Sequence, residues 1–198
     1  MSLQTGVAAI MIRLITGSAD PRHQDLLEEH YRLRHEIFVG ERGWSAIARP
    51  DRREIDAYDT PQTIYVLALD DGGVVGGYRL LPTTAPHLLQ DRFSHLVGGP
   101  VPRGREIHEW SRFFIREGYR GGSLFRQLIG SVPGACQLLG ITSLTSVIEP
   151  DWLSRFDAAR FRYQLLGSFV ETAGMQLAAA QIDIQEASAS GRAIGWDS

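Results

Sequence analysis

Three carboxylates lie within six residues, at Glu54, Asp56 and Asp59, in a polar stretch that is also rich in arginine. A run of mixed charges is most often a solvated loop. Carboxylates this close together could alternatively cradle a cation such as a sulfonium or an amine, because each is ionised at neutral pH. Spacing alone makes the solvated loop the commoner explanation and leaves the cradle open.

A single arginine, Arg79, interrupts the apolar run of residues 74–81. Burying a guanidinium without a partner costs a large amount of free energy. The side chain therefore lies either on an exposed face of a strand or paired with carboxylates inside a cleft. The sequence favours neither position.

Opposite charges stand three residues apart, at Glu109 and Arg112, in the β-rich run of residues 107–115. Side chains alternate between the faces of a regular strand, so these two would point to opposite faces. A β-bulge would bring them to one face, and bulges are common beside active sites. The alternative is an exposed pair, which would add little to stability.

A glycine-rich stretch, residues 116–123, precedes an apolar helical segment. Backbone N–H groups in such a turn, together with the start of a helix, could receive a pyrophosphate. Similar turns are common without any ligand, so this feature alone indicates no function.

The elements that would position these side chains follow from periodicity and turn signals. Strands are expected at residues 11–15, 63–69, 74–81, 107–115, 141–148 and 176–184, and helices at residues 23–39, 124–139 and 152–159, with a short helix near 88–93. The sequence Asp-Asp-Gly-Gly at 70–73 predicts a hairpin. Residues 40–61 form a long polar loop, of a kind that is usually functional or disordered. This order predicts an α/β sandwich around one mixed sheet.

Composition excludes several classes of protein. All 20 basic residues are arginine, which removes enzymes that need a phosphate-loop lysine or a Schiff-base lysine. The net charge of -3 argues against a nucleic-acid or anionic-membrane partner. The one cysteine, Cys136, lies in an apolar helical stretch and is interpreted as a buried structural thiol. The six histidines lack zinc-ligand spacing, so no metal site is expected.

We expect a single domain over residues 1–198, with residues 1–10 an extension and residues 186–198 a flexible tail. No run approaches the ~20 apolar residues of a membrane span. No basic region precedes the short apolar run at the N-terminus, which is unlike a signal peptide. A cytoplasmic location is therefore expected, and the oligomeric state stays open.

Taken together, these stretches resemble the LuxI-type acyl-homoserine lactone synthases, which make autoinducers. The similarity covers about residues 26–115, and each of its short motifs is unspecific alone. The complete set, in order and at compatible spacing, is specific. It is carried by Arg34, Phe38, Glu41, Arg42, Gly43, Trp44, Glu54, Asp56, Asp59, Gly77, Arg79, Phe93, Glu109 and Arg112.

The resemblance implies an α/β/α sandwich similar to the GCN5-type N-acetyltransferases, with one central mixed, mostly antiparallel sheet. It implies an acyltransferase of quorum sensing that joins an acyl thioester to the amine of S-adenosylmethionine. Lactonisation would then release methylthioadenosine. Both ligands are substrates, so no cofactor is expected. The acidic loop, Arg79 and the Glu109/Arg112 pair would converge on one cleft.

The resemblance also assigns catalysis to Glu109, Arg112, Asp56 and Asp59. Glu109 would be the general base that takes the proton of the amine, with Arg112 fixing its geometry. Asp56 and Asp59 would hold the amine or the sulfonium, and Arg79 would pair with one of them.

Substrate binding is assigned to a larger set of residues. Arg34 would pair with a substrate carboxylate or with the acidic loop, and backbone N–H groups near Phe113 would stabilise the oxyanion. Phe38 and Trp44 would wall the adenosyl pocket, because aromatic faces suit a purine and a sulfonium. The further members of this set are Glu54, Arg79, Phe93, Trp110, Ser146 and Trp152.

The acyl group is addressed by the later part of the chain. Ser146 aligns with the position that selects oxidation at the acyl 3-position, and Thr145 is one residue away. Trp110 and the run from Glu149 to Trp152 resemble the branch that takes branched or aromatic acyl groups from coenzyme A, where most members use acyl carrier protein. Trp110 would shorten the acyl tunnel. Arg160 replaces a family glycine and is expected to alter only a surface turn.

Two rival hypotheses remain at this point. A GCN5-like N-acetyltransferase acting on another amine would need an Arg/Gln-x-x-Gly-x-Gly/Ala loop, which Gly118, Gly121 and Ser123 satisfy only in part. A non-catalytic sensor of S-adenosylmethionine or coenzyme A would bind both ligands without turnover. The acyl length and the thioester carrier also stay open.

Overall fold

The fold is taken from a computed structural model that describes residues 10–17 and 21–184. The expected N-terminal extension, apart from Ile10, and the expected tail at 186–198 lie outside the described residues, as does most of the helix-start signal at 18–21.

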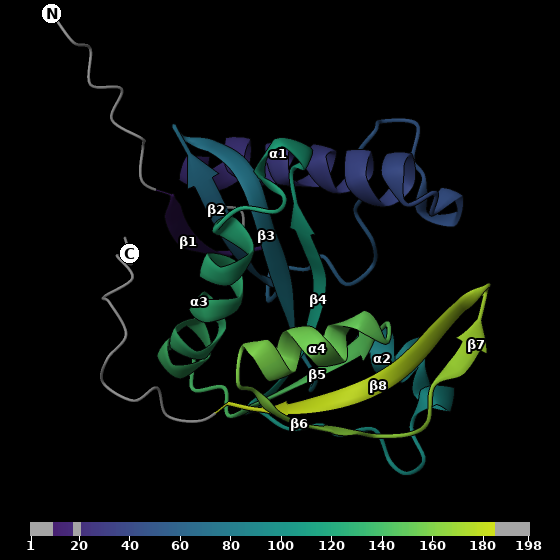
Figure 1. The fold of residues 1–198 in the computed structure, drawn as a ribbon. Coiled ribbons are helices and arrows are strands. Elements are labelled where there is room, and N and C mark those ends of the chain that lie inside the picture. The colour runs from purple at the N-terminus through teal and green to yellow at the C-terminus, as the bar shows by residue number, and fades with distance from the viewer. Residues whose placement is uncertain (1–9, 18–20, 185–198) are drawn as a thin grey trace, which may run out of the picture.

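One twisted sheet forms the centre of the molecule, in the order β1-β2-β3-β4-β5-β8-β6, with β7 also paired to β8 (Figure 1). Its strands are β1 Met11–Thr16, β2 Ile64–Asp70, β3 Gly73–Pro82, β4 Ile107–Ile115, β5 Ser143–Ile148, β6 Arg162–Leu165, β7 Val170–Thr172 and β8 Met175–Asp183. Every neighbouring pair is antiparallel except β4 and β5, which are parallel. The expected mixed, mostly antiparallel sheet is confirmed.

Helices cover both faces of the sheet. They are α1 Gln24–Arg34, which continues as a π-helix at His35–Glu41, α2 Leu88–Asp91, α3 Leu124–Leu138 and α4 Asp151–Ala158. Short 3₁₀ turns lie at Pro21–His23, Ser45–Ile47, Ser94–Leu96 and Glu117–Tyr119. The predicted helix at 23–39 therefore exists, but its last turns are widened, which is frequent at functional sites.

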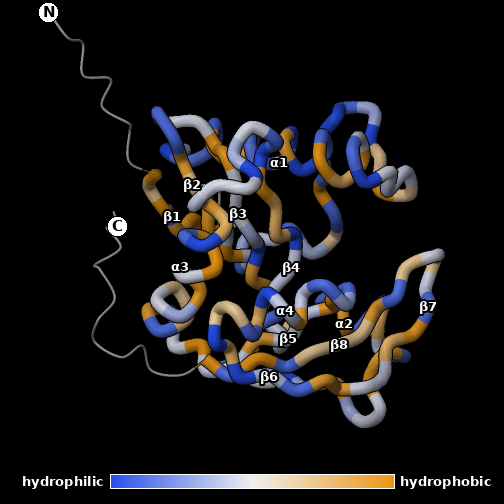
Figure 2. Tube along the Cα trace, in the orientation of Figure 1, coloured by the Kyte–Doolittle hydropathy of each residue, from blue (hydrophilic) through white to orange (hydrophobic). Residues whose placement is uncertain are grey.

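Alternation along the strands divides the core between the two faces. Tyr65 and Leu67 of β2 pack toward α1. Val66 and Ala68 of the same strand pack toward α3. Hydrophobic residues are concentrated along the strands (Figure 2). The sheet therefore has helices on both sides, as the expected α/β/α sandwich requires.

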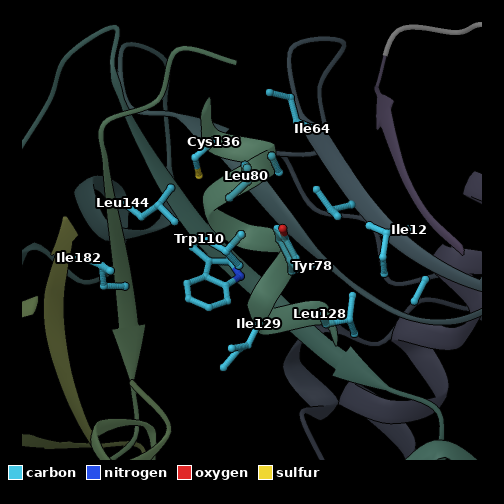
Figure 3. Close-up of a cluster of buried hydrophobic side chains, with 14 of the residues drawn as sticks. Ile12, Ile64, Tyr78, Leu80, Trp110, Leu128, Ile129, Cys136, Leu144 and Ile182 are labelled. Carbon is cyan, nitrogen blue, oxygen red and sulfur yellow. The ribbon is translucent and has the colours of Figure 1, made fainter. Parts of the chain in front are cut away.

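The larger core cluster lies between the sheet and the helices α3 and α4 (Figure 3). Cys136 of α3 is fully buried there, and burial raises the pKa of its thiol to about 12. The interpretation of this residue as a structural thiol fits that environment, because a thiol with so high a pKa is a poor nucleophile.

Two irregular strand pairings matter for function. The register between β3 and β4 shifts so that Arg112 and Phe113 stand opposite Tyr78 alone, and Arg112 has φ 54°. Of the two alternatives left open by the sequence, the β-bulge is the one present. The parallel strands β4 and β5 pair only over Ile107–Glu109 and Ser143–Thr145, and then diverge (Figure 1).

Sequence patterns missed β6 and β7, because both are short and mostly exposed. The predicted hairpin between β2 and β3 is confirmed, with Asp71 and Gly72 at φ 49° and 82°. Arg160 takes φ 58° in an exposed turn after α4, a backbone conformation that favours glycine. Among the described residues no helix is long and apolar enough to cross a bilayer.

Candidate active site

Six side chains of alternating charge form a closed ring on the α1 face of the sheet. Each carboxylate contacts two arginines and each arginine contacts two carboxylates, and every link includes a contact of 3.1 Å or shorter. The members follow one another in the order Glu54, Arg34, Asp59, Arg79, Asp56 and Arg112, and Arg112 closes the ring onto Glu54. We call this set the charge ring.

Four separate elements supply the charge ring. Arg34 ends the regular part of α1, Arg79 lies in β3 and Arg112 lies at the bulge of β4. The three carboxylates come from the long loop between the π-helix and β2. This loop is held in place by backbone hydrogen bonds, including Glu54 N–H to the carbonyl of Tyr31 at 3.0 Å.

The ring resolves the two open questions about these charges. Arg79 is not on an exposed face; it is fully buried and forms a bidentate pair with Asp56 at 2.8 and 3.1 Å. Arg34 binds the acidic loop, with two hydrogen bonds to Asp59 at 2.8 and 3.1 Å. Its side chain is fully buried, so the loop and not a substrate carboxylate is its partner.

Electrostatics keep the buried ring members ionised. Burial alone would raise the pKa of Asp59, but the attraction of Arg34 and Arg79 outweighs it and holds that pKa far below its ordinary value. The same balance, with Arg34 and Arg112 as partners, lowers the pKa of Glu54. Three positive and three negative charges then sum to zero, so the ring is not the strongly anionic cradle that the acidic spacing suggested.

Ring members differ in whether a ligand can reach them. Asp59 is fully buried, and its oxygens accept hydrogen bonds from Arg34, the Tyr65 hydroxyl at 2.8 Å and the Asp56 N–H at 2.8 Å. The oxygens of Asp59 are therefore occupied by protein donors, and its expected contact with a substrate cation stays a prediction. The Asp56 and Arg112 side chains retain 18% and 10% of their exposure and form the accessible edge of the ring.

Glu109 lies on the same face of β4, but the structure does not join it to Arg112. Its carboxylate accepts a hydrogen bond from the backbone N–H of Leu89, at the start of α2, at 3.0 Å. Arg112 instead turns to Glu54 and Asp56. The expectation that Arg112 fixes the geometry of Glu109 is thus wrong, because α2 supplies the contact.

Burial dominates the chemistry of Glu109. The carboxyl is 1% exposed, and desolvation raises its pKa to about 7, against smaller lowering effects of the Leu89 N–H, Arg79 and Arg112. A carboxyl with a pKa near neutrality can take and return a proton at physiological pH. Glu109 is therefore suited to general acid–base chemistry.

The neighbour of Glu109 across the parallel strands is Thr145. Its hydroxyl is fully buried and has no hydrogen-bond partner among the described residues. Ser146, the aligned candidate, donates its hydroxyl to the carbonyl of Trp110 at 2.9 Å. Of the two hydroxyls, the one on Thr145 is thus free to contact a ligand beside Glu109.

A cavity of about 560 Å³ lies between the π-helix, the last residues of β4, the start of α3 and the start of α4. One end is aromatic, with Phe113, Phe125 and Trp152, and Phe38 stands on the opposite wall. The Arg155 guanidinium lies over the Phe125 and Trp152 rings, at 5.5 and 5.0 Å from their centres. The lining also includes the glycine-rich turn before α3 and, in all, four arginines. These are Arg42, Arg120, Arg126 and Arg155.

Several expected site residues lie elsewhere. Trp110 does not line this cavity; it is 3% exposed and packs edge-on against Tyr78 and Phe161 in the core (Figure 3). Trp110 also packs edge-on against Phe113 and Trp152, two residues that line the cavity, so it stands behind the aromatic wall. That it shortens the acyl tunnel stays a prediction. Phe93 packs beside Leu89 and Leu96 in a third hydrophobic cluster, away from the charge ring.

Phe38 and Trp44 form an aromatic wall beside the ring. Their rings stack at 5.0 Å with an interplanar angle of 20°, and the Arg112 guanidinium lies over both rings at 5.5 and 5.7 Å from their centres. The wall connects the charge ring to the cavity, which Phe38 also lines. The role of the two aromatics in an adenosyl pocket stays a prediction.

Comparison with known proteins identifies the family. The family model described as autoinducer synthase matches residues 19–137. An isovaleryl-homoserine lactone synthase of Bradyrhizobium diazoefficiens is 42% identical over 178 residues, which cover 88% of this chain and 80% of that protein. An acyl-homoserine-lactone synthase of Ralstonia nicotianae is 40% identical over 66% of this chain and 71% of that protein.

The chain belongs to the autoinducer synthase family.

Solved structures agree with this membership. A CoA-dependent acyl-homoserine lactone synthase with S-adenosylmethionine and isopentyl-CoA has a TM-score of 0.87 at 40% identity, covering 89% of this chain and 84% of that one. A second CoA-dependent synthase has a TM-score of 0.82 at 37% identity, with 88% and 89% covered. An acyl-CoA N-acyltransferase from Pseudomonas aeruginosa, 16% identical with a TM-score of 0.62, shares the fold alone.

Some functional residues of this autoinducer synthase carry no sequence signal. The Leu89 N–H is a backbone group, and only the folded position of α2 brings it to Glu109. Tyr65 reads as one more apolar strand residue, although its hydroxyl binds Asp59. Membership of an acyl-transferring family makes a buried general base expected. It does not indicate which backbone N–H donates a hydrogen bond to that base.

Proposed function

We propose that this autoinducer synthase transfers an acyl group from an acyl-CoA to the amine of S-adenosylmethionine and then closes the homoserine lactone. The observation that carries the proposal is the position of Glu109, at the last paired residue before β4 and β5 diverge. A thioester in the opening between the strands would lie against this buried carboxyl.

Glu109 acts as the general base. It accepts a proton from the substrate ammonium, directly or through one water, and the amine then attacks the thioester carbonyl. The tetrahedral intermediate collapses to the amide and expels the thiolate, which takes up a proton. The bulge leaves Arg112 and Phe113 without register partners on β3, so their N–H groups are candidates to stabilise the oxyanion.

The charge ring positions the acceptor. Asp56 presents the accessible carboxylate for the amine or the sulfonium, and Arg112 presents the accessible guanidinium for the substrate carboxylate. Phe38 and Trp44 offer aromatic faces to the adenosyl group. After acyl transfer, the homoserine carboxylate attacks its own γ-carbon and displaces neutral methylthioadenosine. No cofactor is needed for either step.

Two features support coenzyme A as the carrier. The cavity places Arg120 and Arg126 beside Gly121 and Gly122, where phosphates would meet guanidinium groups and backbone N–H groups. The aromatic end at Phe113, Phe125 and Trp152 suits a compact branched or aromatic acyl group. Two similar synthases of known structure are described as CoA-dependent. Because thioesters and S-adenosylmethionine are made inside the cell, a cytoplasmic location accompanies this proposal.

The test is mass spectrometry of products from purified protein, S-adenosylmethionine and parallel panels of acyl-CoA and acyl carrier protein thioesters. We expect an acyl-homoserine lactone and methylthioadenosine with short branched or aromatic CoA esters, and none with Glu109→Gln. Product from carrier-protein donors alone would refute the proposed carrier. Absence of lactone with every donor would refute the proposed function.

A further inference from the structure

Two neighbouring residues at the end of the π-helix reach across the cavity in different directions. Glu41 pairs with Arg120, in the connection between β4 and α3, at 2.6 Å. Arg42 pairs with Glu149, between β5 and α4, also at 2.6 Å. Glu41, Arg42 and Arg120 all line the cavity. Each of the two neighbours thus forms an ion pair with a residue from another part of the chain.

Arg42 also touches the acceptor side. Its guanidinium lies 5.2 Å from the centre of the Trp44 ring, in the position of a cation–π contact. Trp44 in turn stacks on Phe38, and Arg112 of the charge ring covers both aromatic rings. A chain of contacts therefore joins Glu149, through its cavity-lining partner Arg42, to the charge ring.

Backbone hydrogen bonds fix the main chain from Arg42 to Trp44, with the Arg42 N–H bound to the Ile37 carbonyl at 2.9 Å and the Ser45 N–H bound to the Gly43 carbonyl at 2.8 Å. Gly43 has φ 71° and nothing lies within 4 Å of the place where its Cβ would be. Trp44 N–H donates to the carbonyl of Phe38 at 2.9 Å, which holds the main chain but not the indole. The orientation of the indole then depends on the side chains that cover it, of which Arg42 alone is tied to the opposite wall.

We propose that Arg42 and Glu149 are a positioning pair that couples occupancy of the donor cavity to binding in the acceptor pocket. This inference rests on the proposed function of the two sites. A donor in the cavity shields the pair from water and so strengthens it. The strengthened pair holds Trp44 against Phe38, which favours the acceptor. By linkage, the acceptor tightens donor binding by the same factor.

The exposed fractions of the two side chains, 40% and 33%, limit the size of the effect. An exposed ion pair permits a coupling of about two- to fivefold in affinity. Coenzyme A without an acyl group is the suitable probe, since it occupies the cavity and cannot react. Calorimetric titration with S-adenosylmethionine, without and with saturating coenzyme A, measures the coupling in the wild-type protein.

Variants locate the coupling. We expect Arg42→Gln and Glu149→Gln each to reduce the factor to about one, and the double variant to behave as either single variant does. Arg49→Gln is the matched control, because Arg49 pairs with Asp51 at 3.1 Å on the same loop, with similar exposure, and does not cross the cavity. It should retain the wild-type factor.

A factor of one in the wild-type protein, or an unchanged factor in both variants, would overturn the inference. Failure of S-adenosylmethionine to bind the wild-type protein at all would instead refute the proposed function, and the inference with it. Equal melting temperatures of the four variants and the wild type establish that a lost factor does not come from unfolding.

Discussion

The six members of the charge ring look equivalent in composition, but their surroundings give them different tasks. Asp59 is sealed between Arg34 and Arg79, whereas Asp56 keeps an accessible edge. Removing one partner of a buried pair is strongly destabilising because it leaves an uncompensated charge. Burial, and not residue type, therefore distinguishes the structural aspartate, Asp59, from Asp56, which a substrate can reach.

Asp59→Asn should unfold the protein more easily than Asp56→Asn. The first substitution leaves two buried arginines short of a partner and should lower the free energy of unfolding by about 3–5 kcal/mol. The second removes a partly exposed charge, so we expect a smaller loss of stability and a rise in KM for S-adenosylmethionine. Urea denaturation and steady-state kinetics measure the two effects, and equal loss of stability in both variants would contradict this division.

The raised pKa of Glu109 has two consequences for pH. The base is ionised above its folded pKa of about 7, so kcat/KM should rise with pH through that value and level off above it. Glu109→Gln should lower kcat by about 10²–10⁴-fold while both substrates still bind. A pH profile with no limb near 7 would remove Glu109 from the role of base.

The free energy of unfolding of the wild-type protein should fall as pH rises, whereas kcat/KM rises. The folded pKa of about 7 lies above the ordinary 4.5, so between these values the folded protein binds more protons than the unfolded chain and loses stability as pH rises. Glu109→Gln keeps an acceptor for Leu89 and carries no charge. It should therefore gain on the order of 3 kcal/mol relative to wild type between about pH 4.5 and pH 8. Denaturation curves at the two pH values measure this difference, and a constant difference would contradict it.

At the scale of elements, the sequence predicted the helices and strands that are long enough to show a hydrophobic period. The β2–β3 hairpin followed from its Asp-Gly turn, whereas the spacing of Glu109 and Arg112 offered the bulge only as one of two alternatives. The partners of these two side chains did not follow, because a loop far away in sequence reaches Arg112 first and α2 offers only a backbone N–H to Glu109. Short exposed strands such as β6 carry no alternation to detect.

Helix α3, which lines the cavity, contains two residues with low helix propensity. It contains Pro133 in its interior and Gly130 on its exposed face, where nothing lies within 4 Å of an added Cβ. Gly130→Ala should stabilise the protein by about 0.5–1 kcal/mol, because alanine loses less conformational freedom in a helix. We expect the melting temperature to rise by about 2–4 °C. A decrease, measured by circular dichroism, would mean that the glycine is needed for packing.

At the scale of the whole molecule, a net charge of -3 conceals a local excess of arginine at the donor cavity. Raising the ionic strength from about 0.01 to 0.15 M shortens the Debye length from about 30 to 8 Å. We therefore expect KM for acyl-CoA to increase about two- to fivefold over this range, and KM for S-adenosylmethionine to change less, since the charge ring is neutral. Arg126→Gln should weaken the dependence on salt, and an equal response of both KM values would contradict this reasoning.

Beyond Glu109 and Thr145, β4 and β5 no longer pair with each other, so each strand has an open edge there. Backbone amides on such an edge lack a ladder partner, so they exchange their hydrogens with solvent faster than amides in the paired part of the same strand. An extended thioester carrier has amide groups of its own and can lie between the edges as an added strand. Hydrogen–deuterium exchange should then slow at residues 110–113 and 146–148 on donor binding. During each turnover the bound donor would act as a temporary strand between β4 and β5.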